Sequence, residues 1–434
     1  MSKRLRSSLD AVIIGAGVVG AACAYFAGRA GLTVAVVDRG PVAGGTTGAG
    51  EGNLLVSDKE PGPELDLALL SVRLWRELAT VLPPDMEYET KGGLVVAPDA
   101  ATLKALRAYA ESQGAAGVEA AEIEGEALRE LEPHLADGLA GGFHYPQDAQ
   151  IQPARAAARL LAASGASVHL GEEVTAILRT PSGAVRGVRT ARRELTAPAV
   201  VNAAGTWGGA VAALAGVELP VRPRRGFVLV TEPLPRVVRH KVYAADYIAD
   251  VASGSAALQS SAVVEGTPAG PVLIGATRER VGFDRSLSVE ALRRLASQAA
   301  ALFPVLADVR VLRAYHGFRP YLPDHLPAIG PDPRVPGLHH ACGHEGAGIG
   351  LAPATGLLVA AALTGEQPPM DRSPFRPERF GGGGADAGAG CCPGDDLGHG
   401  SGPGGGLACG SGPGHGSDYD PAPDPASGPR ETAP

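Results

Sequence analysis

"DAVIIGAGVVGAACAYFAGRAGLTVAVVD", residues 10–38, predicts in order a strand, a tight turn, a helix and a second strand. The first strand, 12–14, is wholly apolar, which is typical of a strand buried in a parallel sheet. The turn has the spacing G-x-G-x-x-G, made by Gly15, Gly17 and Gly20. Such a turn lets the backbone approach a pyrophosphate at a helix N-terminus, and Asp38 can accept hydrogen bonds from ribose hydroxyls. The stretch therefore predicts dinucleotide binding, although a glycine-rich crossover that binds nothing would share its pattern.

The same stretch has a second interpretation as a secretory signal peptide. Basic residues precede its apolar run, and "ACA" lies at 22–24. The regular glycine spacing and the immediate return to the strand "LTVAVVD", 32–38, favour the buried unit instead. No other apolar run is long enough to cross a bilayer, so we expect no membrane span.

Composition indicates a soluble globular protein of two or three domains. The chain has 434 residues, of which 45% are hydrophobic and 19% charged. A net charge of -8 gives no sign of nucleic-acid binding. Five cysteines form no disulfide framework, so we expect a cytoplasmic protein; they are Cys23, Cys342, Cys391, Cys392 and Cys409.

Glycine turns that follow apolar strands occur in three separate stretches of the chain, and β-rich segments lie between them. This pattern predicts an α/β (α+β overall) fold with a discontinuous Rossmann-like domain and an inserted, mainly antiparallel β domain. We expect the nucleotide-binding domain to consist of residues 8–84, 145–216 and 325–380. The substrate domain would consist of residues 85–144 and 217–324.

Residues 381–434 are rich in Gly, Pro and Ser and nearly free of large apolar side chains. Such a segment cannot bury enough surface to fold, so we predict a disordered low-complexity tail. Its cysteines and histidines could bind a metal, but no C-x₂-C pair exists, and we expect no metal site.

The segment "GPVAGGTTGAGEGNLL", 40–55, favours FAD over NAD as the dinucleotide. It supplies further glycines and the hydroxyls of Thr46 and Thr47, which could bind a second phosphate or a ribityl chain. NAD-binding folds normally continue directly into the next helix at this point.

A second glycine loop, "CGHEGAGIGLAPATG", lies at 342–356, and an Ala/Leu-rich helical stretch follows it. A loop with so few side chains lets backbone N–H groups approach a ligand closely. An ordinary strand-to-helix glycine turn is the alternative.

These motifs, together with "VVNAAGTW" (200–207) and "GFRPYLPDHLPAIG" (317–330), resemble the FAD-dependent oxidoreductases of the D-amino-acid oxidase superfamily. That group includes glycine oxidase, sarcosine oxidase and hydroxyproline or opine dehydrogenase subunits. The resemblance covers roughly residues 10–380. The order and spacing of the last two motifs make it specific.

The resemblance implies a cofactor-binding set around a non-covalent FAD. Val18 and Val19 would present the phosphate loop, and the second glycine loop would wrap the flavin. The full set would be Gly15, Gly17, Val18, Val19, Gly20, Asp38, Arg39, Thr46, Thr47, Glu51, Gly52, Asn53, Val174, Ala204, Gly205, His344, Glu345, Gly346, Ala347, Gly348, Ile349 and Gly350. FAD would be non-covalent because Gly317 stands where covalent members carry a cysteine.

Arg319 matches the arginine that holds the substrate carboxylate in glycine and D-amino-acid oxidases, and a planar guanidinium suits that contact. A surface or structural arginine is the alternative. Leu273 and Ala347 stand near positions where sarcosine oxidases have lysines, which places fast oxygen use in doubt. Arg319 and His344 are the expected catalytic residues, but no residue is a convincing base.

The implied reaction takes a hydride from the C–H next to the amine of an amino or imino acid, giving an imine. Substrates would be of the glycine, sarcosine, D-amino acid or D-hydroxyproline class, and oxygen, a quinone or a redox partner protein would accept the electrons. Three tyrosines would line the pocket: Tyr243, Tyr247 and Tyr321. Alternatives are a catalytic or electron-relay subunit of a hetero-oligomeric opine or hydroxyproline dehydrogenase and, less well supported, an NAD(P)H-dependent flavin reductase.

Overall fold

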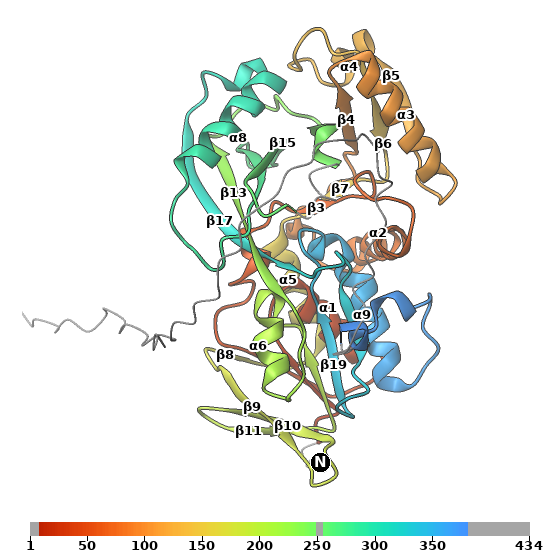
Figure 1. The fold of residues 1–434 in the computed structure, drawn as a ribbon, viewed down its shortest axis with the longest axis vertical. Coiled ribbons are helices and arrows are strands. Elements are labelled where there is room, and N and C mark those ends of the chain that lie inside the picture. The colour runs from red at the N-terminus through yellow and green to blue at the C-terminus, as the bar shows by residue number, and fades with distance from the viewer. Residues whose placement is uncertain (1–7, 249–254, 381–434) are drawn as a thin grey trace, which may run out of the picture. The chain divides into compact units, whose positions relative to one another are not determined.

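A six-stranded sheet contains the two strands of the stretch 10–38, β1 and β2, as neighbouring inner strands (Figure 1). The structure is a computed structural model and describes residues 8–248 and 255–380. The strands run in the order β18-β19-β12-β1-β2-β8, and all neighbours are parallel except β18 and β19. Their bounds are β1 Ala11–Ile14, β2 Val34–Asp38, β8 Ser167–Leu170, β12 Ala199–Asn202, β18 Ala328–Pro331 and β19 Leu338–Cys342.

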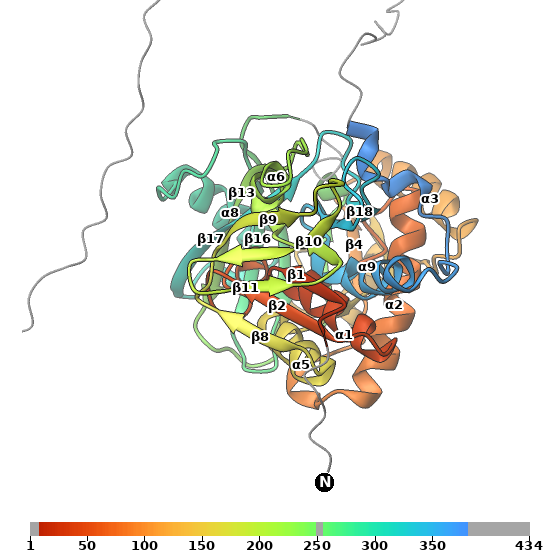
Figure 2. The same cartoon turned by 90° about the horizontal axis from the view of Figure 1, so that it is seen from below.

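Alternate residues of β1 face two different layers. Ala11 and Ile13 pack with the helices on one side, and Val12 and Ile14 pack with a small sheet on the other. The apolar run at 10–29, which has the features of a signal peptide, thus builds this buried core. The helices are α1 Val18–Arg29, α5 Pro153–Ser164 and α9 Gly348–Thr364; the small sheet consists of β9 Val174–Arg179, β10 Val185–Thr190 and β11 Glu194–Thr196 (Figure 2).

The second large sheet has eight strands, in the order β17-β13-β16-β15-β14-β4-β6-β5. All neighbours are antiparallel except β14 and β4. The strands are β4 Gly93–Ala97, β5 Ala121–Glu124, β6 Gly141–Tyr145, β13 Arg222–Thr231, β14 Lys241–Ala244, β15 Gln259–Gly266, β16 Val272–Arg278 and β17 Val311–Tyr321. Helix α8, Val289–Leu302, packs on β13, β15 and β16, while α3, Ala100–Gly114, and α4, Gly125–Leu131, cover β4 and β6.

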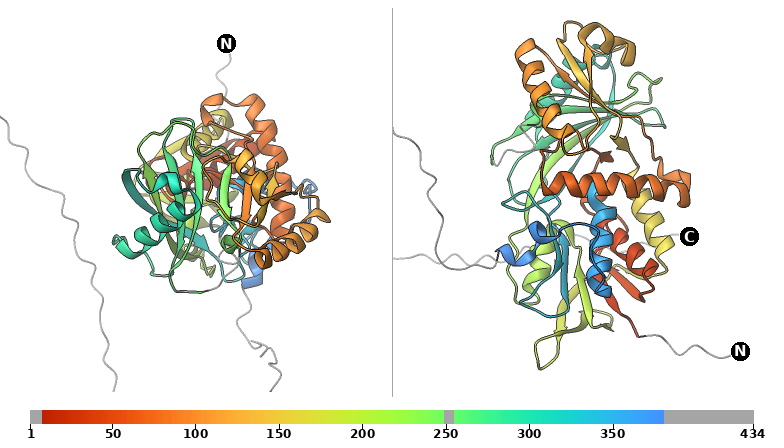
Figure 3. Two further views of the ribbon diagram at one scale, coloured as in Figure 1. Left: turned by 90° about the horizontal axis from the view of Figure 1, so that it is seen from above. Right: turned by 90° about the vertical axis from the view of Figure 1, so that its right-hand side faces the viewer.

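Helix α2, Pro63–Val81, packs against α9 and crosses between the two sheets (Figure 3, right). The indole Nε1 of Trp75 donates to the Ile349 carbonyl at 3.0 Å, and the Ala354 N–H donates to the Ser71 hydroxyl at 3.1 Å. Both bonds are buried and satisfy backbone groups in the first turns of α9. They fix the position where the second glycine loop enters its helix.

The predicted α/β fold is confirmed, with a parallel sheet and a mainly antiparallel one. The described residues form one compact unit, and the predicted boundaries between the nucleotide-binding and substrate domains stay a prediction. The tail at 381–434, with its cysteines and histidines, lies outside the described residues. Within the described ranges, no helix combines the length and apolar character needed to cross a membrane.

Candidate functional site

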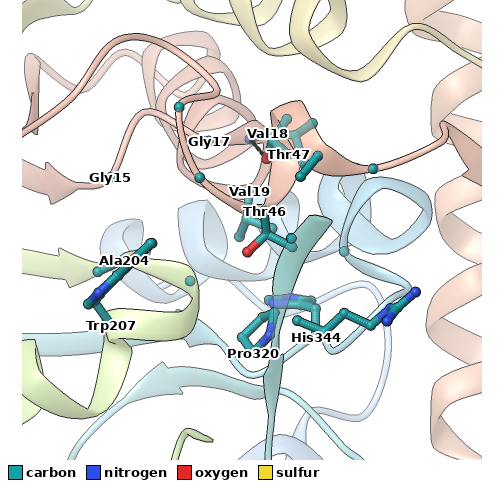
Figure 4. Close-up of a pocket in the computed structure, with 18 of the residues that line it drawn as sticks. Gly15, Gly17, Val18, Val19, Thr46, Thr47, Ala204, Trp207, Pro320 and His344 are labelled. Carbon is teal, nitrogen blue, oxygen red and sulfur yellow. Dashed lines mark hydrogen bonds between the residues drawn. The ribbon is translucent and has the colours of Figure 1, made fainter. Parts of the chain in front are cut away.

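A cavity of about 520 Å³ lies where the carboxyl ends of β1, β2 and β12 meet β13, β16 and β17. It brings together most of the residues predicted from the sequence: Gly15, Gly17, Val18, Val19, Asp38, Arg39, Thr46, Thr47, Glu51, Gly52, Asn53, Val174, Ala204, Gly205, Arg319, His344, Glu345, Gly346, Gly348 and Ile349. Figure 4 shows part of this lining. Ala347 and Gly350 line a neighbouring cavity of about 330 Å³ instead, and Gly20 lines neither.

The phosphate loop owes its shape to glycine. Gly15 has φ +116°, and a Cβ there would lie 2.4 Å from the Ala203 carbonyl oxygen. A Cβ on Gly20 would lie 2.0 Å from the Gly15 carbonyl oxygen, so Gly20 serves the close packing of α1 rather than the cavity. Every larger residue is excluded at both positions because the obstacles are backbone atoms.

The N-terminus of α1 is built to accept an anion. Its N-cap residue, Gly17, provides no side-chain cap. The Val18 N–H donates to the Thr47 hydroxyl at 3.0 Å, which leaves that hydroxyl a proton to donate to a ligand (Figure 4). With the positive end of the helix dipole, this arrangement suits a pyrophosphate.

Asp38 and Thr46 have protein partners that the sequence did not reveal. The Asp38 carboxylate accepts from the N–H groups of Ala16 and Gly40, both at 2.7 Å, and keeps lone pairs for a ribose hydroxyl. The Thr46 hydroxyl donates to the Phe318 carbonyl at 2.6 Å and thereby ties the 40–55 segment to β17. Its predicted contact with a phosphate therefore stays a prediction.

A stack of flat side chains contributes to the wall of the cavity and reaches Phe318 of β17. The Arg39 guanidinium lies 4.3 Å from the Trp207 ring centroid, and Trp207 stacks on Phe283 with centroids 5.6 Å apart. Arg39 and Trp207 both line the cavity, as does Val174. Trp207 was missing from the predicted set, although it ends the quoted motif "VVNAAGTW".

Arg319 is the cationic side chain that β17 presents to the cavity. Its Nη1 donates to the Thr277 carbonyl at 2.8 Å. A Cβ on Gly226 of β13 would lie 2.1 Å from this Nη1, so the glycine makes room for the guanidinium. Burial lowers the pKa of Arg319 to about 10, which still leaves it charged at neutral pH.

His344 and Glu345 lie at the start of the second glycine loop and already have partners. His344 Nε2 lies 3.0 Å from the Thr355 hydroxyl, and burial lowers the pKa of His344 to about 3, so the ring is neutral. Burial would raise the pKa of Glu345, but hydrogen bonds from His325 and Arg224 lower it. Both residues thus have structural bonds, and the catalytic assignment of His344 stays a prediction.

Of the three tyrosines named from the sequence, Tyr247 alone lines the cavity. Tyr243 is buried behind it, where its hydroxyl lies 2.6 Å from the Ser57 hydroxyl. Tyr321 lines neither described cavity. Arg278, which the sequence did not single out, stacks over Tyr247 at 4.7 Å and lines both cavities.

The phosphate loop, the uncapped helix N-terminus and the adjoining cavity fit a dinucleotide, and the Arg319 guanidinium lines the same cavity. The cradle also fits the flavin dinucleotide, because the Thr47 hydroxyl and the bare α9 N-terminus, which has no side-chain cap, open into the same space. A family model described as "FAD dependent oxidoreductase" matches residues 10–362, and the chain belongs to this family. The D-amino-acid oxidase superfamily assignment and FAD as cofactor are thereby confirmed.

The chain matches individual relatives over nearly their whole length. The chain is 31% identical over 426 residues to hydrogen cyanide synthase subunit HcnC of Pseudomonas aeruginosa, covering 87% of this chain and 97% of the relative. It is 32% identical over 378 residues to glycine oxidase of Geobacillus kaustophilus, covering 84% and 96%. The crystal structure of that glycine oxidase matches with a TM-score of 0.76 at 29% identity, covering 86% of this chain and 98% of the other.

Proposed function

We propose that this FAD-dependent oxidoreductase takes a hydride from the C–H next to the amine of an amino or imino acid and gives an imine. The observation that carries the proposal is Arg319, a cation that shares one cavity with the phosphate loop. A planar guanidinium suits a carboxylate, which amino and imino acids of the glycine, sarcosine, D-amino acid and D-hydroxyproline classes all possess. Bound FAD supplies the hydride-accepting chemistry.

The chain's own residues would hold cofactor and substrate in one cavity. Gly17, Val18 and Thr47 would bind the phosphates, and Arg39 with Trp207 would cover the adenosine end. The N-terminus of α9, whose N-cap Ala347 has no side-chain cap, would face the flavin, where its dipole favours negative charge. Arg319 would hold the substrate carboxylate near this end.

A panel of amino and imino acids tests the proposal directly. Under anaerobic conditions, a substrate should bleach the flavin absorbance, and deaminated carboxylates of the same size should leave it unchanged. Bleaching by NADH or NADPH with no response to any amine would overturn the proposal and favour a flavin reductase.

A second candidate is the catalytic or electron-relay subunit of a larger opine- or hydroxyproline-type dehydrogenase. A relative that matches over nearly its whole length is named a subunit of hydrogen cyanide synthase, which favours this candidate. The purified chain alone should then reduce a dye slowly, and a partner preparation should accelerate turnover. Oxygen, a quinone and a redox partner protein remain the candidate acceptors, and the cytoplasmic location stays a prediction.

A further inference from the structure

Glu51 differs from the other carboxylates that line the cavity. Asp38 accepts from backbone N–H groups, Glu345 from Arg224 and His325, Glu172 from Thr190, and Glu173 pairs with Arg39. The Oε1 atom of Glu51 is buried without any hydrogen-bond partner. Across the described ranges, Glu51 has neither a hydrogen bond nor an ion pair within 4.0 Å. A buried carboxylate oxygen without a partner is costly, so a partner from outside the chain would stabilise it.

A glycine of the eight-stranded sheet makes room for this carboxyl group. A Cβ on Gly275 of β16 would lie 2.3 Å from Glu51 Oε1 and 2.4 Å from its Cδ, so the carboxyl group lies directly over the glycine backbone. Gly226 of β13 seats the Arg319 guanidinium in the same way. The negative group of Glu51 and the positive group of Arg319 therefore each contact a glycine, and the two glycines lie on adjacent strands.

The Glu51 carboxyl group and the Arg319 guanidinium both contact β16. Arg319 donates to the carbonyl of Thr277, two residues beyond Gly275 along the strand. Arg319 also lowers the pKa of Glu51, so the two charged groups act on each other. An amino acid carries its carboxylate and ammonium on one carbon, and two neighbouring groups of opposite charge can bind both of them.

Charges on several strands act on Glu51. Burial raises the pKa of Glu51 to about 7, Lys241 lowers it, Glu265 raises it, and Arg319 and Arg278 lower it. Lys241 and Glu265 form a buried ion pair with each other, so their effects on Glu51 oppose. The hydroxyls of Tyr247 and Tyr315 also lie within the influence of Glu51. Glu51 is therefore ionised above about pH 7 and protonated below it.

We propose that Glu51 binds the ammonium group of the substrate whose carboxylate Arg319 holds, and that it accepts a proton from that group. This inference rests on the proposed function. One N–H bond of the ammonium breaks and one O–H bond forms on Glu51. The neutral amine then has a lone pair from which the C=N bond can form as the C–H bond breaks. No residue was identified from the sequence for this task.

Proton counting on the unaltered, FAD-loaded protein tests the proposal. The ligands are 2-aminoisobutyrate, which has no C–H next to its amine and cannot react, and isobutyrate, which lacks the ammonium. Because burial raises the pKa of Glu51 to about 7, both of its protonation states are accessible near neutral pH. An ammonium beside it favours the ionised form, so binding of 2-aminoisobutyrate should release protons; the isobutyrate anion should instead cause uptake. Calorimetry in two buffers of different ionisation enthalpy measures the number of protons released or taken up when each ligand binds. Equal numbers for the two ligands would overturn the proposal.

The variant Glu51→Gln keeps the shape and removes the charge. The wild-type protein should bind 2-aminoisobutyrate more tightly than isobutyrate, whereas this variant should bind both equally, with no proton change near pH 7 for either. Its kcat/KM should fall roughly a hundredfold, and the limb that rises through about pH 7 should disappear. Glu64→Gln, whose carboxylate lines only the neighbouring cavity, is the matched control and should keep the wild-type preference. A Glu51→Gln protein with wild-type ligand preference would refute the role; if this variant fails to fold, the wild-type proton counts decide.

Failure of the proposed function is distinguishable from failure of this inference. If amino acids bleach the flavin but 2-aminoisobutyrate releases no protons, the reaction stands and Glu51 is not the ammonium site. If protons are released but no amino or imino acid bleaches the flavin, the ammonium site stands and the proposed reaction is wrong. Arg319→Leu should weaken both ligands, whereas Glu51→Gln should weaken only the one with an ammonium.

Discussion

The two glycine loops of the cavity look alike in sequence but use glycine for different reasons. In the first loop, Cβ atoms on Gly15 and Gly20 would lie 2.4 and 2.0 Å from backbone oxygens. In the second loop, Cβ atoms on Gly346, Gly348 and Gly350 would meet their nearest atoms at 3.3, 3.4 and 3.7 Å. The first loop therefore needs glycine in order to fold, while these three glycines keep space open beside the cavities. At the two ends of the second loop, Gly343 and Gly356 are required by packing, because their Cβ atoms would lie 2.1 Å from Leu322 Cδ1 and 2.6 Å from the Ala22 backbone. Glycine content alone does not distinguish these two uses.

The largest expected effect, a loss of both folding stability and bound FAD, is that of Gly20→Ala in the first loop. The new methyl group would overlap a backbone oxygen that cannot move without displacing α1 from β1. We expect a loss of about 3 kcal/mol in the free energy of unfolding, measured with urea, and little bound FAD. Gly114→Ala is the control, because nothing lies within 4 Å of its Cβ position. A Gly20→Ala protein with normal FAD content would break the comparison between the loops.

Arg319, which lies against the second loop, should give the next largest effect. Replacing it with Leu should cost roughly 2–5 kcal/mol in kcat/KM, about thirty- to several-thousand-fold, with FAD content unchanged. Arg319→Lys should also be poor, because an ammonium lacks the two-pronged geometry. Rates of flavin reduction measure both. Near wild-type reduction by Arg319→Leu would assign the carboxylate contact to another residue.

Gly346→Ala should have a small effect on stability and a selective effect on substrate. Its Cβ would lie 3.3 Å from Arg319 Nε, so the guanidinium must shift by a few tenths of an ångström. We expect the free energy of unfolding to change by about 0.5 kcal/mol and FAD to remain bound, while KM rises several-fold. In Gly350→Ala, the new Cβ would lie 3.7 Å from its nearest atom, so the free energy of unfolding and KM should both stay close to wild type. Unfolding of Gly346→Ala as severe as that of Gly20→Ala would make the two loops equivalent.

The mildest test leaves the chain unaltered. If both loops hold FAD only through backbone and side-chain contacts, acid precipitation should give a yellow supernatant and a colourless pellet. A side chain at Gly317 would also collide with Ala49, because its Cβ would lie 2.6 Å from the Ala49 Cβ. A washed pellet that stays yellow would show a covalent bond at another residue.

What could be predicted from the sequence depended on how local each constraint is. The strand, the G-x-G-x-x-G turn and Asp38 lie within 10–38, and the structure joins them by the Ala16–Asp38 bond. The seat of Glu51 on Gly275 joins two distant segments, and neither residue reveals the other. Likewise, only the fold shows that Tyr247 faces the cavity while Tyr243 lies behind it.

The antiparallel sheet was harder to predict in detail for the same reason. Its edge-to-edge order places β4, from the first quarter of the chain, parallel to β14, a pairing that no local turn signal specifies. The Thr46–Phe318 hydrogen bond similarly joins the 40–55 segment to β17 across most of the chain. Such contacts depend on the completed packing, because side-chain chemistry alone allows many partners for one hydroxyl.

The cavity lining also fixes when the protein can acquire its cofactor during synthesis. Its wall begins at Ile14 and is completed only by Ile349, and β19 must join β12 before the second glycine loop has its position. A ribosome-bound chain that has emerged only as far as α8 contains the entire phosphate loop but lacks the opposite wall. We therefore expect FAD to bind late in synthesis, and a product truncated before α9 should contain the phosphate loop but should not retain FAD.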